Sequence, residues 1–310
     1  MSDLSGMRIG IIGGSGLGNA LLACGGGGAG AAEALEVETP FGRPSAPLML
    51  SEWNGIPIAF LPRHGVAHTI PPSMIPFRAN IYALKAAGCK WVIASGAVGS
   101  LQEQIAPRDL VLADQAIDKT TRRAGTFFDE VGAAVHVEMS QPFCPQLRGI
   151  LQTAGGGLTL GSSQIHPRGT YVCMEGPAFS TRAESLMHRQ WGGDVIGMTA
   201  MPEARLAREA ELSYALIALA TDYDSWKPHV APAHGGPVAK QALLTEIIGH
   251  MHAATDHALQ LVQAAVPGVW ERRAEVFEAH RALELAIWTD KAKIPAEMRK
   301  RLELLWGRYI

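Results

Sequence analysis

One stretch near residue 220 constrains the fold of this chain more than any other. Leu216–Ala220 is an uninterrupted apolar run, and Asp222 and Asp224 follow it almost at once. Such a run is typical of a strand that is covered on both faces in a parallel sheet. Open α/β sheets bind their ligands just beyond the carboxyl ends of the strands. The stretch therefore predicts a buried strand that ends in a polar site.

The spacing of Asp222 and Asp224 suggests chemistry at this site. Residues two apart on an extended chain point to the same side, so the two carboxylates are expected to lie together. Crowded, partly buried carboxylates can hold one proton near neutral pH and act as an acid or a base. Aspartates that follow a strand also form turns or cap helices. These two residues alone leave both interpretations open.

Composition narrows the class of protein. The chain has 310 residues, 47% of them hydrophobic, which is enough to build a large core in one or two domains. Its 27 Lys and Arg nearly balance 29 Asp and Glu, and no basic block could follow a phosphate backbone, so nucleic acid is not an expected partner. No apolar run is long enough for a membrane span. The four cysteines form no C-x-x-C pair, and the first residues lack the basic start and apolar core of a signal peptide. We therefore expect a cytoplasmic protein with reduced thiols.

Two turns of small residues point to an anion. Gly13–Gly18 follows the predicted strand Met7–Ile12, and its backbone N–H groups could bind an oxyanion together with the hydroxyl of Ser15. Asn19 stands where the dinucleotide fingerprint requires its third glycine, and the lysine of a Walker loop is missing. A second small-residue turn is predicted over residues 95–100. A shared phosphate site and two ordinary tight turns remain alternatives.

A predicted hairpin over residues 48–61, turned at an Asn-Gly pair, leads to Arg63 and His64. The planar guanidinium of Arg63 suits an oxyanion and His64 adds a second donor, although such a pair is also common on protein surfaces. His68 follows His64 at a spacing that would join two metal ligands on a helix. The neighbouring prolines argue against a helix there, so no metal site is predicted.

Strand and helix patterns alternate along most of the chain, which predicts a central mixed β-sheet flanked by helices. A long amphipathic helix is expected over residues 237–266. Two further helices are expected in the tail, the second starting at Pro295 and the first carrying an apolar stripe of Phe277, Leu283 and Ile287. We therefore expect one α/β domain over residues 1–267 and a helical C-terminal extension over residues 268–310.

An ordered set of short motifs between about Ile9 and Lys227 resembles the trimeric purine nucleoside phosphorylases. The motifs are Ile11–Gly16, Thr39–Gly42, Arg63–Gly65, Ala97–Leu101, Met174–Pro177, Met198–Thr199, Pro202–Glu203 and Ala220–Trp226. The resemblance implies the fold of that family and a homotrimer or dimer of trimers in which a neighbour completes each pocket. It implies no cofactor and no metal, with inorganic phosphate as a co-substrate. The tail beyond about Pro267 is not covered.

The family attacks the anomeric carbon of a nucleoside with phosphate through a cation-like ribosyl transition state and releases the purine. The residues that the resemblance places around phosphate are Ser15, Arg63, His64, Gly96, Ala97 and Thr199. Gly96 stands where the family often has threonine, so that contact would come from backbone or from Ser95. Phe179 would stack on the base and Met198 would lie against the ribose. Asp222 would share a proton with N7, and Asp224 would accept from the 6-amino group.

The resemblance also bears on the substrate. Family members that use 6-oxopurines place Asn at the position of Asp222 and Glu at the position of Ser180, so this chain is expected to favour adenine. The expected reaction is phosphorolysis of 5'-methylthioadenosine to adenine and 5-methylthioribose 1-phosphate, a step of purine and methionine salvage. His136 matches the family residue that lies near the 5' end of the ribose. Val238 is expected to make the apolar contact with the 5' substituent. His234 could instead serve a 5'-hydroxyl, which leaves adenosine and 5'-deoxyadenosine open.

Three other functions remain to be distinguished. One is a phosphorylase for 6-oxopurine nucleosides or methylthioinosine. Another is a nicotinamide-dependent oxidoreductase that uses the first glycine turn, although the spacing at Asn19 counts against it. The third is a protein that binds a nucleoside without cleaving it.

Overall fold

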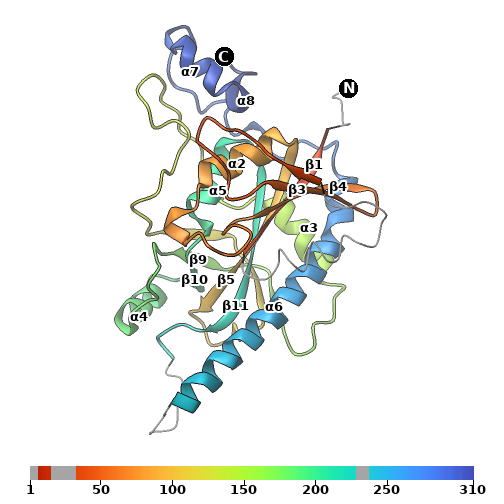
Figure 1. Ribbon diagram of the computed structural model, residues 1–310, viewed down its shortest axis with the longest axis vertical. Coiled ribbons are helices and arrows are strands. Elements are labelled where there is room, and N and C mark those ends of the chain that lie inside the picture. Colours follow the sequence, from red (N-terminus) through yellow and green to blue (C-terminus); the bar gives the residue numbers. More distant parts are fainter. Residues whose placement is uncertain (1–5, 15–32, 228–236) are drawn as a thin grey trace.

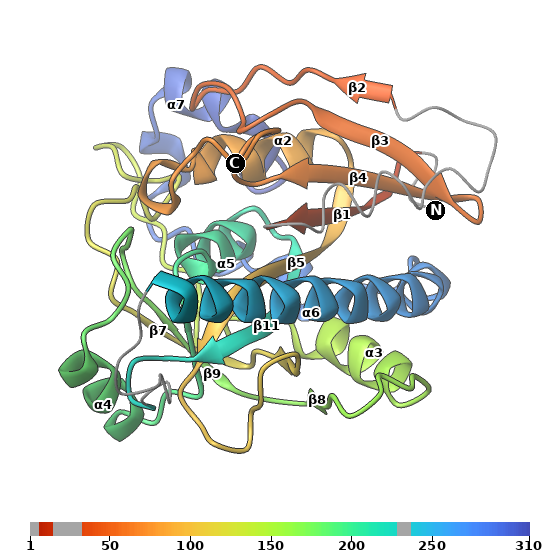
Figure 2. The same ribbon diagram turned by 60° about the horizontal axis from the view of Figure 1, so that its bottom comes forward.

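The computed structural model describes residues 6–14, 33–227 and 237–310. Eleven strands of the described chain form one mixed sheet, and helices pack against both of its faces (Figures 1 and 2). The predicted fold class, a mixed central sheet flanked by helices, is confirmed. Among the described residues, no helix has both the length and the apolar character that crossing a membrane requires.

The sheet is mixed because it contains both parallel and antiparallel pairs of neighbouring strands. The strands are β1 Arg8–Gly13, β2 Glu33–Leu35, β3 Leu48–Trp53, β4 Ile56–Pro62, β5 Cys89–Ser100, β6 Leu110–Leu112, β7 Gln115–Asp118, β8 Ile165–His166, β9 Thr170–Cys173, β10 Val195–Gly197 and β11 Ser213–Tyr223. Their order is β2-β3-β4-β1-β5-β10-β9-β7, with β11 paired to both β5 and β6 and with β8 paired to β6. β1 pairs in parallel with β4 and β5, and β5 pairs in parallel with β11.

The core has two layers, one on each face of the sheet. Helices α2 (Phe77–Ala86) and α5 (Ala200–Glu209) bury their apolar faces in one hydrophobic cluster. Helices α3 (Pro145–Gly155) and α6 (Pro237–Glu271) bury theirs in another, on the opposite face of the sheet (Figure 2). The remaining helices are α4 Arg182–Gln190, α7 Ala296–Arg301 and α8 Glu303–Trp306. This two-layered burial fixes the sheet as a rigid platform for the site.

The predicted hairpin over residues 48–61 is confirmed. β3 and β4 pair antiparallel, and the turn residues Asn54 and Gly55 have φ values of 50° and 75°. Positive φ at both central positions is what a type I′ turn requires, and Asn-Gly adopts it at low cost. β4 therefore ends at Pro62, directly before Arg63 and His64.

The predicted turn over residues 95–100 is wrong. β5 continues through Ser100, because the backbone of its small residues pairs with the long strand β11. The register between the two strands shifts between Ala220 and Asp222, which places a bulge at Thr221. Asp222 thus lies inside the strand, one position beyond a bulge, and Asp224 follows its end. Bulges of this kind redirect the side chains that follow them.

The tail differs from its predicted helix. α6 continues past residue 267 to Glu271, and the chain then turns back through a short 3-10 helix over Glu278–Arg281. Residues 287 and 288 instead contact the loop before α3, through a Val135–Ile287 bridge and a hydrogen bond from the Trp288 N–H to the Ala134 carbonyl. The apolar residues of the stripe are used for packing in an irregular segment. The second predicted tail helix is present as α7 and α8.

Glu211 fixes this tail to the domain. It occupies the turn between α5 and β11 with a φ of 55° and is 4% exposed. Its carboxylate accepts hydrogen bonds from the Leu283 N–H at 3.0 Å and from the Tyr309 hydroxyl at 2.6 Å, and it pairs with Arg308. One buried carboxylate therefore gathers two separate parts of the C-terminal segment.

We expect Glu211→Ala to lower the free energy of unfolding by about 3 kcal/mol, because it leaves a buried N–H and a hydroxyl without their acceptor. Chemical denaturation measures the loss. Tyr309→Phe removes one hydrogen bond and is expected to cost about 1 kcal/mol. Glu284→Ala changes an exposed glutamate of the same segment and serves as the control. If Glu211→Ala loses no more unfolding free energy than the control, Glu211 does not fix the tail to the domain.

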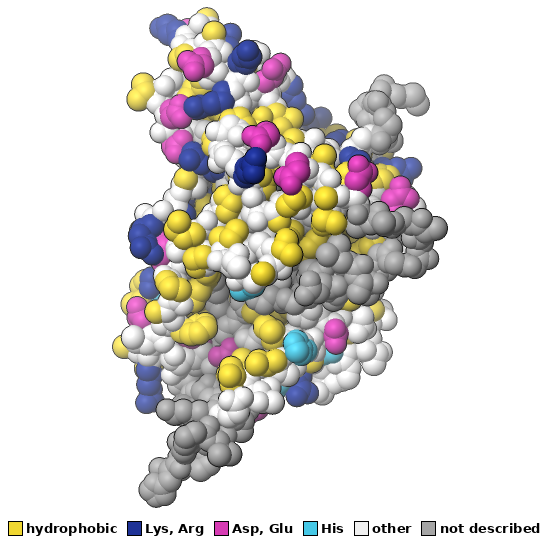
Figure 3. All heavy atoms as spheres, viewed as in Figure 1, with side chains coloured by type: hydrophobic (Ala, Val, Ile, Leu, Met, Phe, Trp, Pro, Cys, Tyr) yellow, Lys and Arg dark blue, Asp and Glu magenta, His cyan; other side chains and the backbone are white. Residues whose placement is uncertain are grey.

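Charged side chains of both signs gather at the end of the molecule formed by α7 and α8, and no continuous basic surface is visible on this face (Figure 3). The formal charge of the chain is -2. A nucleic-acid-binding face would instead collect lysine and arginine in a stripe or patch.

Candidate active site

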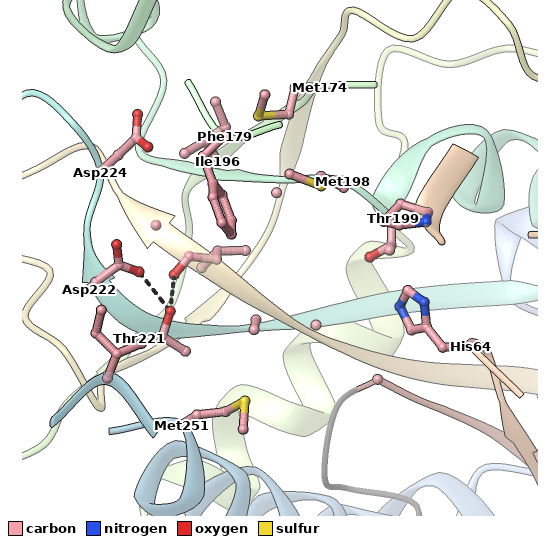
Figure 4. Close-up of a pocket in the computed structure, with 18 of the residues that line it drawn as sticks. His64, Met174, Phe179, Ile196, Met198, Thr199, Thr221, Asp222, Asp224 and Met251 are labelled. Atoms are coloured by element: carbon pink, nitrogen blue, oxygen red, sulfur yellow. Dashed lines mark hydrogen bonds between the residues drawn. The ribbon is translucent and has the colours of Figure 1, made fainter. Parts of the chain in front are cut away.

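A cavity of about 570 Å³ opens where β5, β11 and β10 end, with α6 along one side. Its residues come from the segments after β1, β4 and β9, from the β10–α5 turn and from the first half of α6. Figure 4 shows Asp222 and Asp224 at one end and His64 with Thr199 at the other. We call these the carboxylate end and the anion end. The cavity lies where the apolar run before Asp222 predicted a site.

The anion end brings together five of the six residues expected to hold phosphate, namely Arg63, His64, Gly96, Ala97 and Thr199, all of which line the cavity. A Cβ atom on Gly96 would lie 3.2 Å from Thr199 Oγ1, and a Cβ atom on Gly14 would lie 3.5 Å from Arg63 Nη1. The two glycines therefore let the hydroxyl and the guanidinium approach the backbone closely. Ser15 lies outside the described residues.

Arg63 is completely buried and held on three sides. Its Nε and Nη2 donate to the two carboxylate oxygens of Glu203, each at 2.7 Å, and its Nη1 donates to the Ser95 carbonyl at 2.9 Å. Burial alone would lower the pKa of Arg63, but the adjacent Glu203 carboxylate raises it above its ordinary value. Tyr214 donates its hydroxyl to Glu203 Oε1 at 2.7 Å. The charged pair is thus fixed in one geometry.

Sequence reasoning missed Glu203 as a functional residue. It belongs to a motif that carried the resemblance, but nothing in its sequence neighbourhood connects it with Arg63, which lies 140 positions earlier. Helix α5 buries Glu203 completely, and a buried charge in a helix is rare unless it is paired. The sheet brings β4 and the start of α5 together, and this makes the pair.

His64 has a defined orientation. Its Nδ1 lies 2.8 Å from the Ile70 carbonyl oxygen, and its ring stacks on His68 with centroids 4.2 Å apart. Burial lowers the pKa of His64 to about 4, and the positive charge of Arg63 acts in the same direction. The imidazole is therefore neutral at pH 7.

The carboxylate end depends on the bulge in β11. Thr221 donates its hydroxyl to Asp222 Oδ1 at 2.8 Å and also lies 3.2 Å from the Val98 carbonyl oxygen (Figure 4). Asp224 is 7% exposed, and its Oδ2 has no hydrogen-bond partner within the described part of the chain. A Cβ atom on Gly99 would lie 3.1 Å from the Asp224 Cβ, so glycine makes room for this side chain. A buried carboxylate oxygen of this kind needs a donor, which a water molecule or a ligand can supply.

The residues after β9 form the wall above the carboxylate end. Phe179 lines the cavity and is 83% exposed, so its ring is open to contact with a flat ligand. Ser180 is buried, outside the cavity lining, and its carbonyl accepts from the Ser225 hydroxyl at 2.7 Å. The Trp226 N–H donates to the Ser185 hydroxyl at 3.1 Å. These two bonds tie the Phe179 segment and α4 to the segment that carries Asp224.

Arg123 is a second residue that sequence reasoning missed. Its guanidinium donates to the Glu175 carboxylate and carbonyl at 2.8 Å each, and to the Met198 and Met201 carbonyls at 2.7 Å each. Although burial opposes it, hydrogen bonds from two backbone N–H groups and from Arg123 lower the pKa of Glu175 to about 2. Arg123 therefore holds together the chain segments of the cavity residues Met174 and Met198. It belongs to the long connection between β7 and α3.

An apolar face of α6 closes one side of the cavity. Its members, spaced by three or four residues along the helix, are Leu244, Ile247, Ile248 and Met251. His250 Nδ1 lies 3.1 Å from the Thr221 carbonyl oxygen and so links α6 to the bulge of β11. We call Leu244, Ile247, Ile248 and Met251 the α6 wall. Val238, expected to provide an apolar contact, lies in the first turn of α6, and its side chain is outside those that the structure describes.

His136 is not among the residues of this chain that line the cavity. It is exposed, its ring contacts Trp288 with centroids 4.7 Å apart, and its backbone N–H donates to the Ala286 carbonyl. It therefore belongs to the surface where the loop before α3 meets the tail. His234 lies outside the described residues. Within the described part of the chain, no group of three or more His, Cys, Asp or Glu side chains could hold a metal ion.

Comparison with known proteins gives consistent results. The profile of the Phosphorylase superfamily matches residues 8–267. S-methyl-5'-thioadenosine phosphorylase from a Synechocystis species is 46% identical over 308 residues, covering 97% of this chain and 87% of that protein. The protein of the same name from Pyrococcus horikoshii is 45% identical over 266 residues, covering 86% of this chain and 94% of that protein.

Solved structures show the same similarity. A methylthioadenosine phosphorylase from an antarctic soil metagenomic library has a TM-score of 0.83 and 42% identity, covering 96% of this chain and 98% of that chain. Methylthioadenosine phosphorylase from Schistosoma mansoni in complex with tubercidin has a TM-score of 0.78 and 32% identity, covering 91% of this chain and 100% of that chain.

Proposed function

Because this chain belongs to the phosphorylase superfamily, we propose that it is a pentosyltransferase that converts 5'-methylthioadenosine and phosphate to adenine and 5-methylthioribose 1-phosphate. The observation that carries this proposal is one cavity with an anion end and a carboxylate end. Both ends are needed, because the reaction joins phosphate to the carbon from which the base departs. Relatives named S-methyl-5'-thioadenosine phosphorylase that match most of the chain support the same substrate.

In this mechanism, phosphate occupies the anion end near Arg63, His64 and Thr199. The bond between C1′ and N9 breaks and leaves its electrons on the purine, while a phosphate oxygen forms the new bond to C1′. Negative charge gathers on the departing base, and Asp222 supplies a proton to N7. Proton transfer by a positioned side chain typically contributes about 10²–10⁴-fold to the rate. Phosphate stabilises the positive charge on the ribosyl group electrostatically.

The choice of base follows from Asp224. Its buried Oδ2 has no partner among the described residues and needs a donor, which a 6-amino group provides. A 6-oxo group would place another acceptor against it, and a site built for a donor discriminates strongly against such an analogue. Adenine is therefore the preferred leaving base, and 6-oxopurine nucleosides are poor substrates.

The remaining contacts are part of the same proposal. Phe179 stacks on the base, Met198 lies against the ribose, and Ser15 adds a hydroxyl to the phosphate site. We place His136 at the pocket of a neighbouring subunit in the homotrimer expected for the family. Inorganic phosphate is a co-substrate, and the reaction requires no further cofactor. We place it in purine and methionine salvage in the cytoplasm.

The direct test measures release of adenine from 5'-methylthioadenosine with and without phosphate. Release that requires phosphate, with formation of a ribose 1-phosphate product, supports phosphorolysis. Equal rates in both conditions reject it. Intact nucleoside after long incubation would identify a binding protein, and a change in nicotinamide absorbance would identify an oxidoreductase.

The α6 wall predicts the preferred 5′ substituent. An apolar methylthio group buried against Ile247 and Met251 gains about 1–2 kcal/mol over a hydroxyl that loses water there, so kcat/KM should fall about 5- to 30-fold from 5'-methylthioadenosine to adenosine. Initial rates with the methylthio, hydrogen and hydroxyl compounds measure this order.

A variant of the wall provides the complementary measurement. Ile247→Ser should lower kcat/KM for the methylthio compound about tenfold and change the rate with adenosine much less. Gln263→Ser alters an exposed residue of α6 outside the cavity and is the matched control. If Ile247→Ser reduces both substrates equally, the wall does not select the 5′ group.

A further inference from the structure

The hydrogen bond of His64 defines which of its ring nitrogens carries the proton. Nδ1 lies 2.8 Å from the Ile70 carbonyl oxygen, and a carbonyl oxygen can only accept, so Nδ1 carries the hydrogen. Nε2 makes no hydrogen bond to any of the described residues, and His64 lines the cavity beside Arg63. In a neutral ring with this tautomer, Nε2 presents a lone pair and accepts a hydrogen bond.

The surroundings of His64 keep the ring neutral. Burial is the main cause that lowers its pKa to about 4, and Arg63 and the stacked His68 oppose a positive charge as well. Glu203 is the group whose charge acts in the other direction, and both of its carboxylate oxygens already bind Arg63. The buried pair of Arg63 and Glu203 has no net charge. The anion end is therefore less positive than the presence of an arginine and a histidine suggests.

We propose that His64 binds a protonated oxygen of the substrate anion through Nε2, so that the site selects hydrogen phosphate and similar protonated oxyanions over sulfate. This inference rests on the proposed function, because it concerns the anion that the enzyme uses. Near neutral pH, phosphate carries at least one hydrogen and can donate it to Nε2. Sulfate carries none, and its oxygens meet the lone pair of Nε2 as a second acceptor.

The selection follows from the cost of an unsatisfied acceptor. Sulfate can bind well only if the buried imidazole first takes a proton from solvent, which the surroundings of His64 disfavour. Its affinity should therefore fall as the pH rises, by up to about tenfold per pH unit while binding remains coupled to uptake of one proton. Hydrogen phosphate brings its own proton, so its affinity should stay nearly constant over the same alkaline range. The difference is a case of specificity through mismatched polar groups.

The experiment is a titration of the purified protein with phosphate and with sulfate in the absence of nucleoside, from about pH 7 to about pH 9, by calorimetry. We expect phosphate to bind at least about tenfold more tightly than sulfate at the alkaline end. Arsenate, which also carries a proton, should follow phosphate. Equal affinities for phosphate and sulfate, or a sulfate affinity that is independent of pH, would overturn the proposal.

A substitution tests whether His64 is the cause. The amide of His64→Gln can turn either its N–H or its oxygen toward a ligand, so the phosphate-to-sulfate ratio should fall to within about threefold of one. His252→Gln, on the exposed side of α6, should retain the wild-type ratio. Retention of the full ratio in a folded His64→Gln protein would overturn the proposal. The wild-type pH series decides the question even if that variant does not fold.

Failure of this inference differs from failure of the proposed function. Anion binding is measured directly, whereas the proposed function is tested by phosphate-dependent release of adenine. Phosphorolysis without anion selectivity rejects the role of His64 alone. Selective phosphate binding without cleavage of the nucleoside supports that role and rejects the proposed reaction.

Discussion

We expect Asp222→Asn to lower kcat for 5'-methylthioadenosine by about 10²–10⁴-fold, because in the proposed mechanism the amide cannot transfer a proton to the departing adenine. The amide has nearly the same volume and still accepts from Thr221, so KM should change little. A loss confined to kcat is the signature of an interaction made in the transition state. Steady-state kinetics with saturating phosphate measure both constants.

Two comparisons make this prediction specific. Asp256→Asn changes an exposed aspartate of α6 outside the cavity and should keep wild-type kinetics. In Asp222→Asn, the rate with a 6-oxopurine nucleoside relative to the 6-aminopurine should rise, since the amide offers a donor in place of an acceptor. Near wild-type kcat in this variant would remove Asp222 from the proton transfer.

Glu203→Ala is expected to lower the free energy of unfolding by about 3–5 kcal/mol, because it leaves the guanidinium of Arg63 buried without its counter-charge. The effect is large because Arg63 is 0% exposed and both of its bonds to Glu203 are 2.7 Å long. The freed guanidinium also loses its orientation, so KM for phosphate should rise at least about tenfold. Denaturant unfolding and phosphate kinetics give the two values.

The rest of the network provides the matched control for Glu203→Ala. Tyr214→Phe removes the hydroxyl that donates to Glu203 at 2.7 Å but keeps the charged pair. It should cost about 1.5–3 kcal/mol, less than Glu203→Ala, and leave KM for phosphate close to the wild-type value. Similar losses of unfolding free energy in the two variants would mean that the ion pair contributes no more than the single hydrogen bond from the Tyr214 hydroxyl.

Local chemistry explains which elements could be predicted. The turn at Asn54 and Gly55, the buried strand before Asp222, and the place of Arg63 and His64 directly after the hairpin could be predicted because each signal lies within a few neighbouring residues. Backbone preference and apolar periodicity act over this range. The carboxyl ends of the sheet strands then place such residues at one edge, as expected for an α/β fold.

Long-range contacts explain what the sequence did not show. The partners of Arg63 and of Arg123 come from other parts of the sheet, and the α6 wall reaches the cavity because His250 meets the bulge at Thr221. None of these contacts leaves a periodic signal. The apolar stripe of the tail has helical spacing, and for this reason the sequence predicted a helix there. The conformation of that segment is decided instead by its packing around Glu211.

The sequence by itself determined the class of fold, the hairpin, and the polar residues that form the two ends of the cavity. Tertiary structure decided the rest: the length of β5 and β11, the pairing of Arg63 with Glu203, the neutral state of His64, and the apolar side of the cavity. The physical reason is that a side chain's type is local, whereas its burial, charge state and orientation depend on neighbours that only the folded sheet brings within contact distance.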